Sequence, residues 1–516
     1  MNADKNKESV FIRVHLCPKI IILITILGLD IGTTSTKGVL FDLAGAEVAR
    51  GSSPAYRNLT RRAGWVEQEP EEIWQAVLTA VSQTLSQAPP NITVKAICIA
   101  AQSGSLLPAD ADGNPVYPLI TWLDGRSQQL VQQWKDEGLE ARVKQISGWS
   151  LYPGLPLPNI AWLRQNDPVT FAAARRYLSV NDFIAHRLTG QFVSNPSNGG
   201  GMQLIDIRTG NWSDELCGLA GILPEQLSPI QLAGAVIGEI LPEVRRATGL
   251  SDGVVLINGG HDQGCTALGL GITSPGKMLL ACGTAWVFTG VMNAPELGSV
   301  PAALDWNFHA MRDRYTISQS LGGLGASLEW WLTQAWRGVD GKVSRREMFA
   351  ALDDELKGAK GNSRLLFRPL TGGHSDPATT QRGGFSGLQL SHSRADMARA
   401  ILESAAFELR WALQSIQQAG LPIERLWMVG GAAQSPHWPQ ILADVLGIPI
   451  RLPQYDNWPA LGTAVMAGVS LGAFESVAEG VTHFQKPARD LLPDERMREW
   501  YDGIFELYQN AGPAPP

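Results

Sequence analysis

Two aspartates in this 516-residue chain each follow an apolar run and lie beside glycine and polar residues. Asp30 lies in LGLDIGTTSTK, and Asp262 lies in VVLINGGHDQG. A carboxylate beside glycine and hydroxyl groups suits a phosphate bound together with Mg²⁺. A carboxylate at a glycine-rich strand end can accept a proton from a substrate hydroxyl. The pattern therefore indicates a phosphate and metal site near Asp30, and for Asp262 it fits two roles equally, acceptance of a proton during phosphoryl transfer or the cap of a helix.

The turn after Asp30 carries the groups that a phosphate needs. Gly32 lets the backbone approach closely, the next four residues supply hydroxyl donors, and Lys37 adds a positive charge. A related piece, ACGT, recurs in the second half of the chain as far as Gly283-Thr284. Two such hairpins predict a nucleotide held between two halves of the molecule. The alternative for each is an ordinary hairpin with a polar turn.

Asp262 also has a structural alternative, as the N-cap of a helix that starts at Gln263. Its neighbour His261 is expected to be structural or to orient the substrate, since no second histidine lies at metal-ligand spacing. Gln102 follows another apolar run, and Asp124 lies in the nearby TWLDGR. These amide and carboxylate groups suit hydrogen bonding to a polyhydroxylated ligand.

The segment LWMVGGAAQSPHW, residues 426–438, predicts a strand, a double-glycine turn and a helix start. Two glycines would let a flat ring or a phosphate lie against the backbone. Tight packing of strand on helix is the alternative. The chain contains neither a GxxxxGK[ST] loop nor a GxGxxG turn after a strand, which argues against those nucleotide-binding folds.

The elements that must position these groups alternate between strand and helix. In the first half we expect a strand at about 26–31, a second run at Thr36–Phe41, a helix from Pro70, and buried strands at Val94–Ala101 and Val254–Gly260. Residues 125–250 show a mainly helical pattern. This alternation predicts an α/β fold.

The second half repeats the opening hairpin after a boundary at Thr273–Gly276. It continues with predicted helices at Ala326–Trp336 and Ala395–Gln418, strands at Leu426–Val429 and Ile448–Leu452, and helices from Trp438 and Ala460. The repeated hairpin suggests that the two halves are distant duplicates.

Composition excludes several classes of protein. A net charge of −7 without a basic stripe argues against a nucleic-acid partner. Five scattered cysteines without a CxxC pair fit a reducing compartment and disfavour zinc. The apolar run Ile20–Leu27 is too short to span a membrane and has no cleavage site after it, so we expect a cytoplasmic protein in which residues 1–25 form an extension. A secretory signal is the alternative.

Taken together, these motifs resemble the FGGY carbohydrate kinases of the actin-like ATPase superfamily. The resemblance covers roughly residues 26–490 and rests on the following segments in order: LDIGTTSTK, GWVEQEPEEIW, TWLDGR, RLTG, GGHDQG, ACGT, GASLEWW, RGGFSGL, VGGAAQSPHWPQILAD and ALGTAVMAG. It implies two ribonuclease H-like domains with a catalytic cleft between them. Residues 26–272 would form the sugar-binding domain and 273–516 the nucleotide-binding domain.

By position, the resemblance implies that Asp262 is the base and that Asp30 helps to hold Mg²⁺. The residues implied for ATP are Thr33, Thr34, Lys37, Gly283, Thr284, Gly325, Glu329, Gly431 and Ser435. Those implied for the sugar are Gln102, Asp124, Asp262 and Gln263. The expected reaction is ATP-dependent phosphorylation of a hydroxyl of a sugar, polyol or sugar acid. The sequence leaves open whether the chain is a monomer or a homodimer.

Departures from the family pattern leave the acceptor open. The xylulokinase motif SGQMHG appears as AQSGS at Ala101–Ser105, which retains Gln102 but lacks Met and His. The Arg-Glu pair of glycerol kinases is absent from this region, and the family's G-E-R stretch appears as Pro369–His374. A non-catalytic sugar or nucleotide sensor and an actin-like ATPase without a sugar are the alternatives, both disfavoured by Asp262 and the sugar-side motifs.

Overall fold

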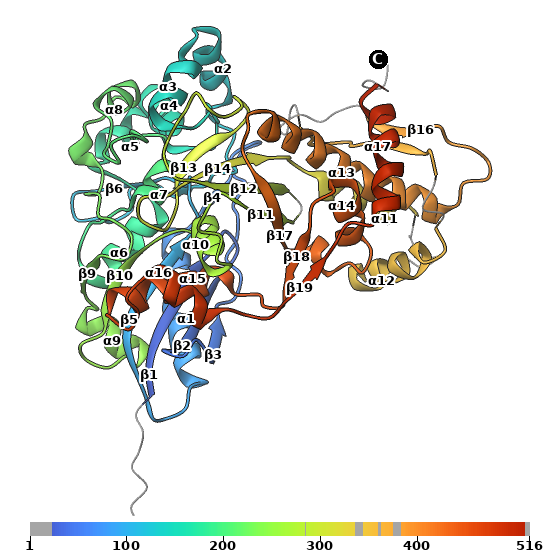
Figure 1. Ribbon diagram of the computed structural model, residues 1–516. Helices are drawn as coiled ribbons and strands as arrows, with labels where there is room; N and C mark the ends of the chain where they lie inside the picture. The colour runs from blue at the N-terminus through green and yellow to red at the C-terminus, as the bar shows by residue number, and fades with distance from the viewer. Residues whose placement is uncertain (1–22, 284, 336–343, 360–362, 375–382, 511–516) are drawn as a thin grey trace, which may run out of the picture.

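The computed structural model describes residues 23–510 except 284, 336–343, 360–362 and 375–382 (Figure 1). Its first sheet has six strands in the order β3 (Glu47–Ser52), β2 (Thr36–Asp42), β1 (Leu23–Ile31), β5 (Ile92–Ala101), β10 (Val255–His261) and β9 (Val236–Glu239). Strands β1, β5 and β10 are parallel, whereas β2, β3 and β9 run antiparallel to their neighbours. The carboxyl ends of the three parallel strands therefore meet at one edge.

Strand β1 is longer than the sequence pattern predicts, because it begins at Leu23 rather than near residue 26. Residues 23–25 pair with Ile92, Thr93 and Val94 of β5, so hydrogen bonding extends the strand beyond its most apolar part. Five consecutive residues of β1, 25–29, are buried. Such a continuous buried run is typical of a central strand with both faces covered.

The two faces of this sheet are covered by different parts of the chain. On one face lie α1 (Pro70–Ser86) and α6 (Val180–Thr189), with α9 (Pro242–Thr248) beside α1. Proline at the first helical position and acidic residues in the first turn favour the start of α1 at the predicted residue. On the other face lie α10 (Asp262–Gly269), α15 (Trp458–Ser470) and α16 (Val477–Phe484).

A second sheet resembles the first in strand order and direction. Its order is β13 (Asp305–Phe308), β14 (Tyr315–Ser320), β12 (Trp286–Met292), β11 (Gly276–Cys282), β17 (Ile423–Val429), β18 (Ile450–Pro453) and β19 (Ala488–Leu491). The last six match the first sheet in order and in direction, with β11, β17 and β18 parallel and the flanking strands antiparallel. Strand β13 has no counterpart, and the edge strands differ in connectivity, because β9 precedes β10 in the chain whereas β19 follows β18. The five strands β1, β2, β3, β5 and β10 therefore correspond in order, direction and chain connection to β11, β12, β14, β17 and β18, as the suggested duplication predicts.

The helices of the second half form its core against this sheet. They are α11 (Leu324–Ala335), α12 (Arg345–Leu356), α13 (Arg394–Gln418), α14 (Trp438–Leu446) and α17 (Glu495–Asn510). A short hairpin of β15 (Leu366–Arg368) and β16 (Gly384–Ser386) packs into the same core. The predicted helix at 326–336 corresponds to α11, although Trp336 lies outside the described residues.

The fold differs in one respect from two contiguous halves. Helices α15 and α16 belong to the second half of the sequence but lie against the first sheet, as the red helices beside β5 and β10 in Figure 1 show. The approach is close, since a β-carbon at Gly28 of β1 would overlap the carbonyl of Ala460. A β-carbon at Gly462 of α15 would likewise overlap the carbonyl of Cys265 in α10. Residues 458–484 therefore belong structurally with the first sheet.

A helical insert extends the first half away from its sheet. Its helices are α2 (Gln128–Asp136), α3 (Leu139–Ser147), α4 (Pro156–Asn166), α5 (Pro168–Ala173) and α8 (Asp214–Ala220), which share one apolar core. Two short pairings connect the insert to the sheet, namely β4 (Glu67–Gln68) with β7 (Leu119–Ile120) and β6 (Leu107–Ala109) with β8 (Arg176–Leu178). The short helix α7 (Pro196–Gly200) leads back toward β10.

Candidate active site

The two predicted aspartates lie at the same edge of the first sheet. Asp30 is next to last in β1 and pairs with Ala100 of β5, and Asp262 directly follows β10 on the other side of β5. Two strand spacings separate them, roughly 10 Å. The parallel arrangement thus brings together two residues that are far apart in the sequence.

A β-bulge shapes the strand end before Asp262. The register of β10 on β5 shifts between Ile257 and Gly260. A β-carbon at Gly259 would overlap the carbonyl of Ile99, and one at Gly260 would lie 2.8 Å from the hydroxyl oxygen of Ser197. The two glycines are therefore required for the chain to bend into α10 at this point.

Asp262 is the first residue of α10, and His261 occupies the cap position. Asp262 Oδ1 accepts the backbone N–H of Gln263 at 2.6 Å and lies 3.0 Å from His261 Nε2. The side chain is 32% exposed, and Oδ2 has no hydrogen-bond partner among the described residues. One carboxylate oxygen is therefore held in place while the other remains available to a ligand.

Asp30 lies in an environment that disfavours its charged form. Burial, together with the negative charge of Asp262, raises the pKa of Asp30 to about 7, and Lys37 opposes the shift. A divalent cation near Asp30 and Asp262 would relieve this repulsion, so the site fits Mg²⁺. No group of three or more His, Cys, Asp or Glu side chains in the described ranges could hold a metal. Mg²⁺ would thus depend on nucleotide phosphates and water for its other ligands.

The turn after β1 presents a row of unpaired backbone donors. The N–H groups of Thr33, Thr34 and Ser35 make no hydrogen bond within the described chain. The carbonyls beside them are occupied, because Thr34 O accepts Tyr56 N–H at 2.9 Å and Gly32 O accepts the Tyr56 hydroxyl. Successive free N–H groups in a turn form a concave anion site. This geometry is the one that the GTTS sequence predicts.

The structure brings Gln102 and Gln263, which the sequence predicts for the sugar, to this same edge. Gln102 follows β5 directly, and its side chain is almost fully buried. Gln263 lies one residue beyond Asp262, and its Oε1 accepts the Thr289 hydroxyl of β12 at 3.4 Å. Gln263 therefore connects the start of α10, beside Asp262, to the second sheet.

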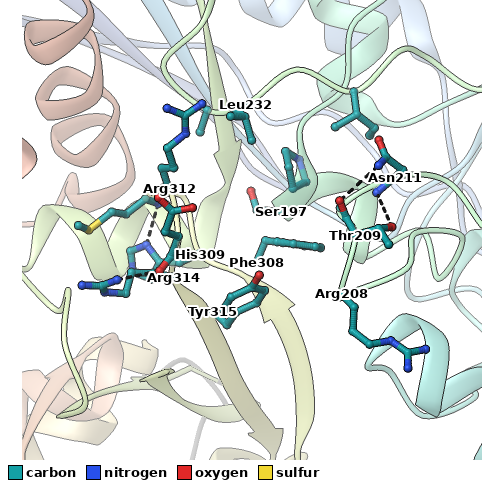
Figure 2. A pocket seen from close by; sticks show the side chains of 16 residues that line it. Ser197, Arg208, Thr209, Asn211, Leu232, Phe308, His309, Arg312, Arg314 and Tyr315 are labelled. Atoms are coloured by element: carbon teal, nitrogen blue, oxygen red, sulfur yellow. Dashed lines mark hydrogen bonds between the residues drawn. The ribbon is translucent and has the colours of Figure 1, made fainter. Parts of the chain in front are cut away.

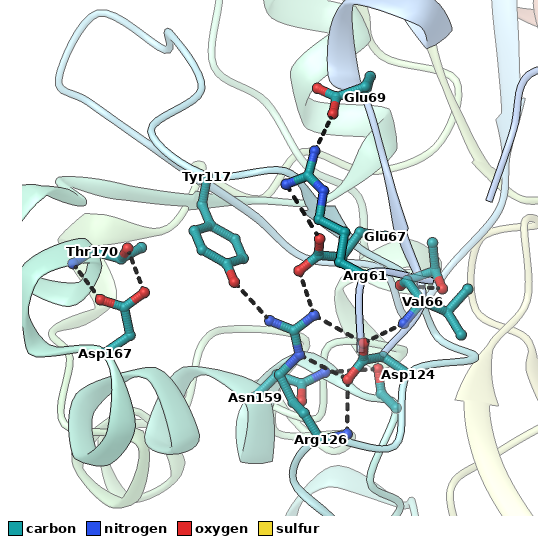
Figure 3. A network of polar contacts seen from close by, with 12 residues as sticks. Arg61, Val66, Glu67, Glu69, Tyr117, Asp124, Arg126, Asn159, Asp167 and Thr170 are labelled. Carbon is teal, nitrogen blue, oxygen red and sulfur yellow. Dashed lines mark hydrogen bonds and ion pairs between the residues drawn. The ribbon is translucent and has the colours of Figure 1, made fainter. Parts of the chain in front are cut away.

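Asp124 is placed differently from the sequence-based expectation that it faces the sugar. Its carboxylate is fully buried beneath the insert and forms a double contact with Arg126, at 2.8 Å to Nε and 2.9 Å to Nη2 (Figure 3). It also accepts the backbone N–H of Val66 at 2.6 Å. Arg126 also forms an ion pair with Glu67, with 2.7 Å between Nη2 and Oε1. With its oxygens occupied in this way, Asp124 fixes loops around the site rather than presenting an oxygen to solvent.

Most of the residues that the sequence predicts for the nucleotide lie on the second half. Strand β11 ends before Gly283, and a β-carbon at Gly430, after the adjacent β17, would overlap the carbonyl of Cys282. Gly431 begins the short turn of helix Gly431–Gln434. Thr284 lies outside the described residues. The carboxyl ends of β11 and β17 thus meet as those of β1 and β5 do.

Three further residues from the sequence prediction line the same half. Gly325 and Glu329 lie in the first turns of α11, and both are partly exposed. Ser435 accepts the N–H groups of His437 and Trp438 and donates to Asp353 Oδ1 at 3.2 Å. Its hydroxyl therefore orders the start of α14 in this structure.

Sequence reasoning missed two side chains that contact Thr33 in the turn after β1, for which the sequence predicts a phosphate site (below, the phosphate turn). Gln68 Nε2 donates to the carbonyl of Thr33 at 2.7 Å, and Trp122 Nε1 donates to its hydroxyl at 3.2 Å. Both lie in segments that the resemblance includes, GWVEQEPEEIW and TWLDGR. The motifs were therefore visible, but their contact with the turn depends on the tertiary fold.

A cavity of about 330 Å³ lies at the seam between the halves, next to the strand end before Asp262, because Ser197 in its wall accepts the backbone N–H of His261 at 2.9 Å (Figure 2). It is lined by Ser197 and residues 208–211 from one half and by residues 308, 309 and 311–315 from the other. His309 beside it bonds through Nε2 to Ile272 O at 3.1 Å and accepts Met311 N–H at Nδ1. These contacts attach the β13–β14 turn to the segment that joins the two sheets.

Comparison with known proteins identifies the family of this two-sheet fold. The N-terminal domain model of the FGGY family of carbohydrate kinases matches residues 25–269, and the C-terminal domain model matches 278–471. The chain belongs to the FGGY family of carbohydrate kinases. Its reaction is therefore an ATP-dependent phosphotransfer to an alcohol group of a sugar. The two ribonuclease H-like domains expected from the sequence are also confirmed.

Over nearly its whole length, this FGGY kinase is similar to relatives that are named for different substrates. It is 27% identical to the xylulose kinase of Bacillus subtilis, covering 94% of this chain and 96% of the relative. It is 26% identical to the gluconokinase of Bacillus licheniformis, covering 91% of this chain and 93% of the relative. The gluconate kinase structure from Lactobacillus acidophilus matches with a TM-score of 0.86 at 25% identity, covering 95% of this chain and 97% of that structure's chain. Among the described residues of this kinase, no helix is long and apolar enough to cross a membrane.

Proposed function

We propose that this FGGY kinase transfers the γ-phosphoryl group of ATP to one hydroxyl of a small ketose, polyol or sugar acid, with Asp262 as the base. The observation that supports this most directly is the placement of Asp262 at a bulged strand end, with one oxygen held and the other free. Phosphoryl transfer requires positioning and charge neutralisation more than covalent chemistry. One oriented carboxylate is sufficient to accept the hydroxyl proton.

The neighbours of Asp262 would set its orientation. Gln263 N–H and His261 Nε2 both contact Oδ1, which leaves Oδ2 to point toward an acceptor hydroxyl. Gln102 and Gln263 would then hydrogen-bond other hydroxyls of the acceptor. Asp124, proposed for the sugar from sequence, would act by holding Arg126 and the loop after β4.

ATP would bind across the two sheet edges. Its phosphates would meet the free N–H groups of Thr33 and Thr34, with Lys37, Gly283 and Thr284 alongside. The adenosine would lie near the residues that surround the second sheet edge, namely Gly325, Glu329, Gly431 and Ser435. Mg²⁺ would be held by Asp30 and the phosphates and would neutralise charge on the transferred group.

The relatives suggest which acceptors to test first. Several are named for xylulose and others for gluconate, so a ketopentose and a sugar acid represent the two leading chemical classes. The AQSGS segment retains Gln102 but lacks the Met-His pair of the xylulokinase motif. We therefore propose an acceptor pocket whose contacts differ from those of that motif at this strand end.

The test is ADP release from Mg·ATP across a panel of ketoses, polyols and sugar acids. Stimulation by one acceptor supports the proposal, and ADP release independent of every acceptor would contradict it. Asp262→Asn should retain ATP binding but lose roughly 10²- to 10⁴-fold in kcat with that acceptor. Asp252→Asn, an exposed aspartate before β10, is the matched control. Near-normal turnover by the Asp262 variant would reject the base assignment.

A further inference from the structure

Gln68 occupies an unusual position between the two sides of the site. Its side chain is only 1% exposed, and it lies at the end of the two-residue strand β4. Nε2 donates to Thr33 O at 2.7 Å and to Asn58 Oδ1 at 2.8 Å, while Oε1 accepts from Gln102 Nε2 at 3.5 Å. One buried amide thus connects the acceptor-side Gln102 with the phosphate turn.

We infer that Gln68 is a positioning residue that couples acceptor binding to the phosphate turn through Thr33. The inference rests on the proposed function, because it takes Gln102 as an acceptor contact and the turn as a phosphate contact. It assigns Gln68 no direct contact with either substrate.

The physical basis is the geometry of the peptide that joins Thr33 to Thr34. In a trans peptide the C=O and the following N–H lie in one plane and point in opposite directions. Gln68 holds the C=O of Thr33, so the N–H of Thr34 must point away from Gln68. That N–H is one of the free donors of the turn. Gln68 therefore fixes the direction of a proposed phosphate donor.

The scaffold around Gln68 is rigid enough for this purpose. Its backbone pairs with Leu119 of β7, and the preceding residue, Glu67, contacts Arg126 at 2.7 Å in the buried cluster of Figure 3. The indole N–H of Trp122 holds the hydroxyl of Thr33 from a second direction. Thr33 is thus fixed at both its carbonyl and its side chain.

The connection to Gln102 gives this arrangement a consequence for substrate coupling. The 3.5 Å separation between the two amides is at the long limit of a hydrogen bond. An acceptor that hydrogen-bonds to Gln102 would reorient its amide and so change its contact with Gln68. Thr33 and Thr34 would respond, since they are attached to the same side chain.

The test uses Gln68→Glu, which keeps the shape of the side chain but removes the N–H donor. Near the carbonyl of Thr33 the new oxygen would repel rather than bind. We expect the Kd for ATP, measured calorimetrically on the full chain, to rise roughly tenfold, since such contacts are worth about that factor. We also expect kcat to fall and acceptor-independent ADP release to increase relative to transfer.

Two further variants make the result decisive. Gln68→Leu removes the donor without adding charge and serves if the glutamate variant fails to fold. Gln129→Glu, an exposed glutamine of α2, repeats the chemical change away from the site and should match the wild type. A folded Gln68 variant with wild-type ATP affinity and an unchanged ratio of hydrolysis to transfer would overturn the inference. Absence of acceptor-stimulated turnover in the wild type would instead reject the proposed function, and the ATP-affinity comparison would still test Gln68.

Discussion

Replacement of Arg126 by methionine should strongly destabilise the first half of the molecule. The guanidinium contacts Asp124 through Nε and Nη2, Glu67 through Nη2 and the Tyr117 hydroxyl through Nη1. All three charged side chains are 0–1% exposed. Its removal leaves buried Asp124 without a cation and leaves Glu67 only the 3.6 Å contact with the half-exposed Arg61. Breaking a buried pair in this way costs about 3–5 kcal/mol. For a domain of this size, that loss corresponds to a melting temperature lower by about 6–20 °C.

The assay is thermal unfolding, followed by calorimetry so that the two halves can be resolved. Arg142→Met is the matched control, since Arg142 makes a similar double contact with Glu215, at 2.7 and 2.5 Å, but both side chains are about half exposed. Solvent-exposed pairs contribute little to stability, so this variant should melt close to the wild type. Equal melting temperatures for the two variants would refute the reasoning that burial makes the Arg126 cluster important.

Three other predictions follow from separate features. Asp30→Asn should raise the Mg²⁺ concentration needed for half-maximal turnover roughly tenfold or more, and an unchanged Mg²⁺ titration would contradict its proposed role. Burial lowers the pKa of His309 to about 4, so the neutral ring stabilises the fold above pH 6.5 and this stabilisation is lost as the pH falls toward 4. His309→Gln should reduce the loss in free energy of unfolding between pH 6.5 and pH 4 by at most about 3 kcal/mol, which a melting curve at each pH would detect. An equally steep pH profile would reject the explanation. Gly28→Ala should lower the free energy of unfolding by about 1–3 kcal/mol, because the new methyl group would force α15 away from β1. The control Gly503→Ala, in open space on α17, should leave the free energy of unfolding unchanged or raise it. Equal effects of the two substitutions would show that the close approach of α15 to β1 is unimportant.

Local patterns were sufficient to predict most of the strands and helices near the site. The apolar run before Asp30 and the run before Asp262 both form parallel strands, and both aspartates reach the same sheet edge. Helix α1 begins at the predicted Pro70, because proline and acidic residues favour a helix start locally. For Asp262 the helix begins at the aspartate itself, one residue earlier than the N-cap alternative implies.

What the sequence could not predict depends on partners that are distant in the chain. Asp124 looks like a ligand-facing carboxylate until Glu67 and Arg126 are seen to enclose it. The contact of Gln68 with Thr33 likewise crosses 35 residues. Helix α15 has an apolar pattern that fits either half, and its assignment to the first sheet follows only from the close approach at Gly28. In each case the residue types were visible but the partner was not.

The return of α15 and α16 to the first sheet also sets an order for folding during synthesis. Strands β1, β5 and β10 are complete once residue 261 has been made, but the helices that finish covering one of their faces end at residue 484. Until then apolar side chains such as Ile26 and Ala96 lack part of their covering. A nascent chain with such an uncovered face is prone to aggregation or chaperone capture. A segment made late in synthesis, residues 458–484, thus completes the covering of the sheet whose strands are made first.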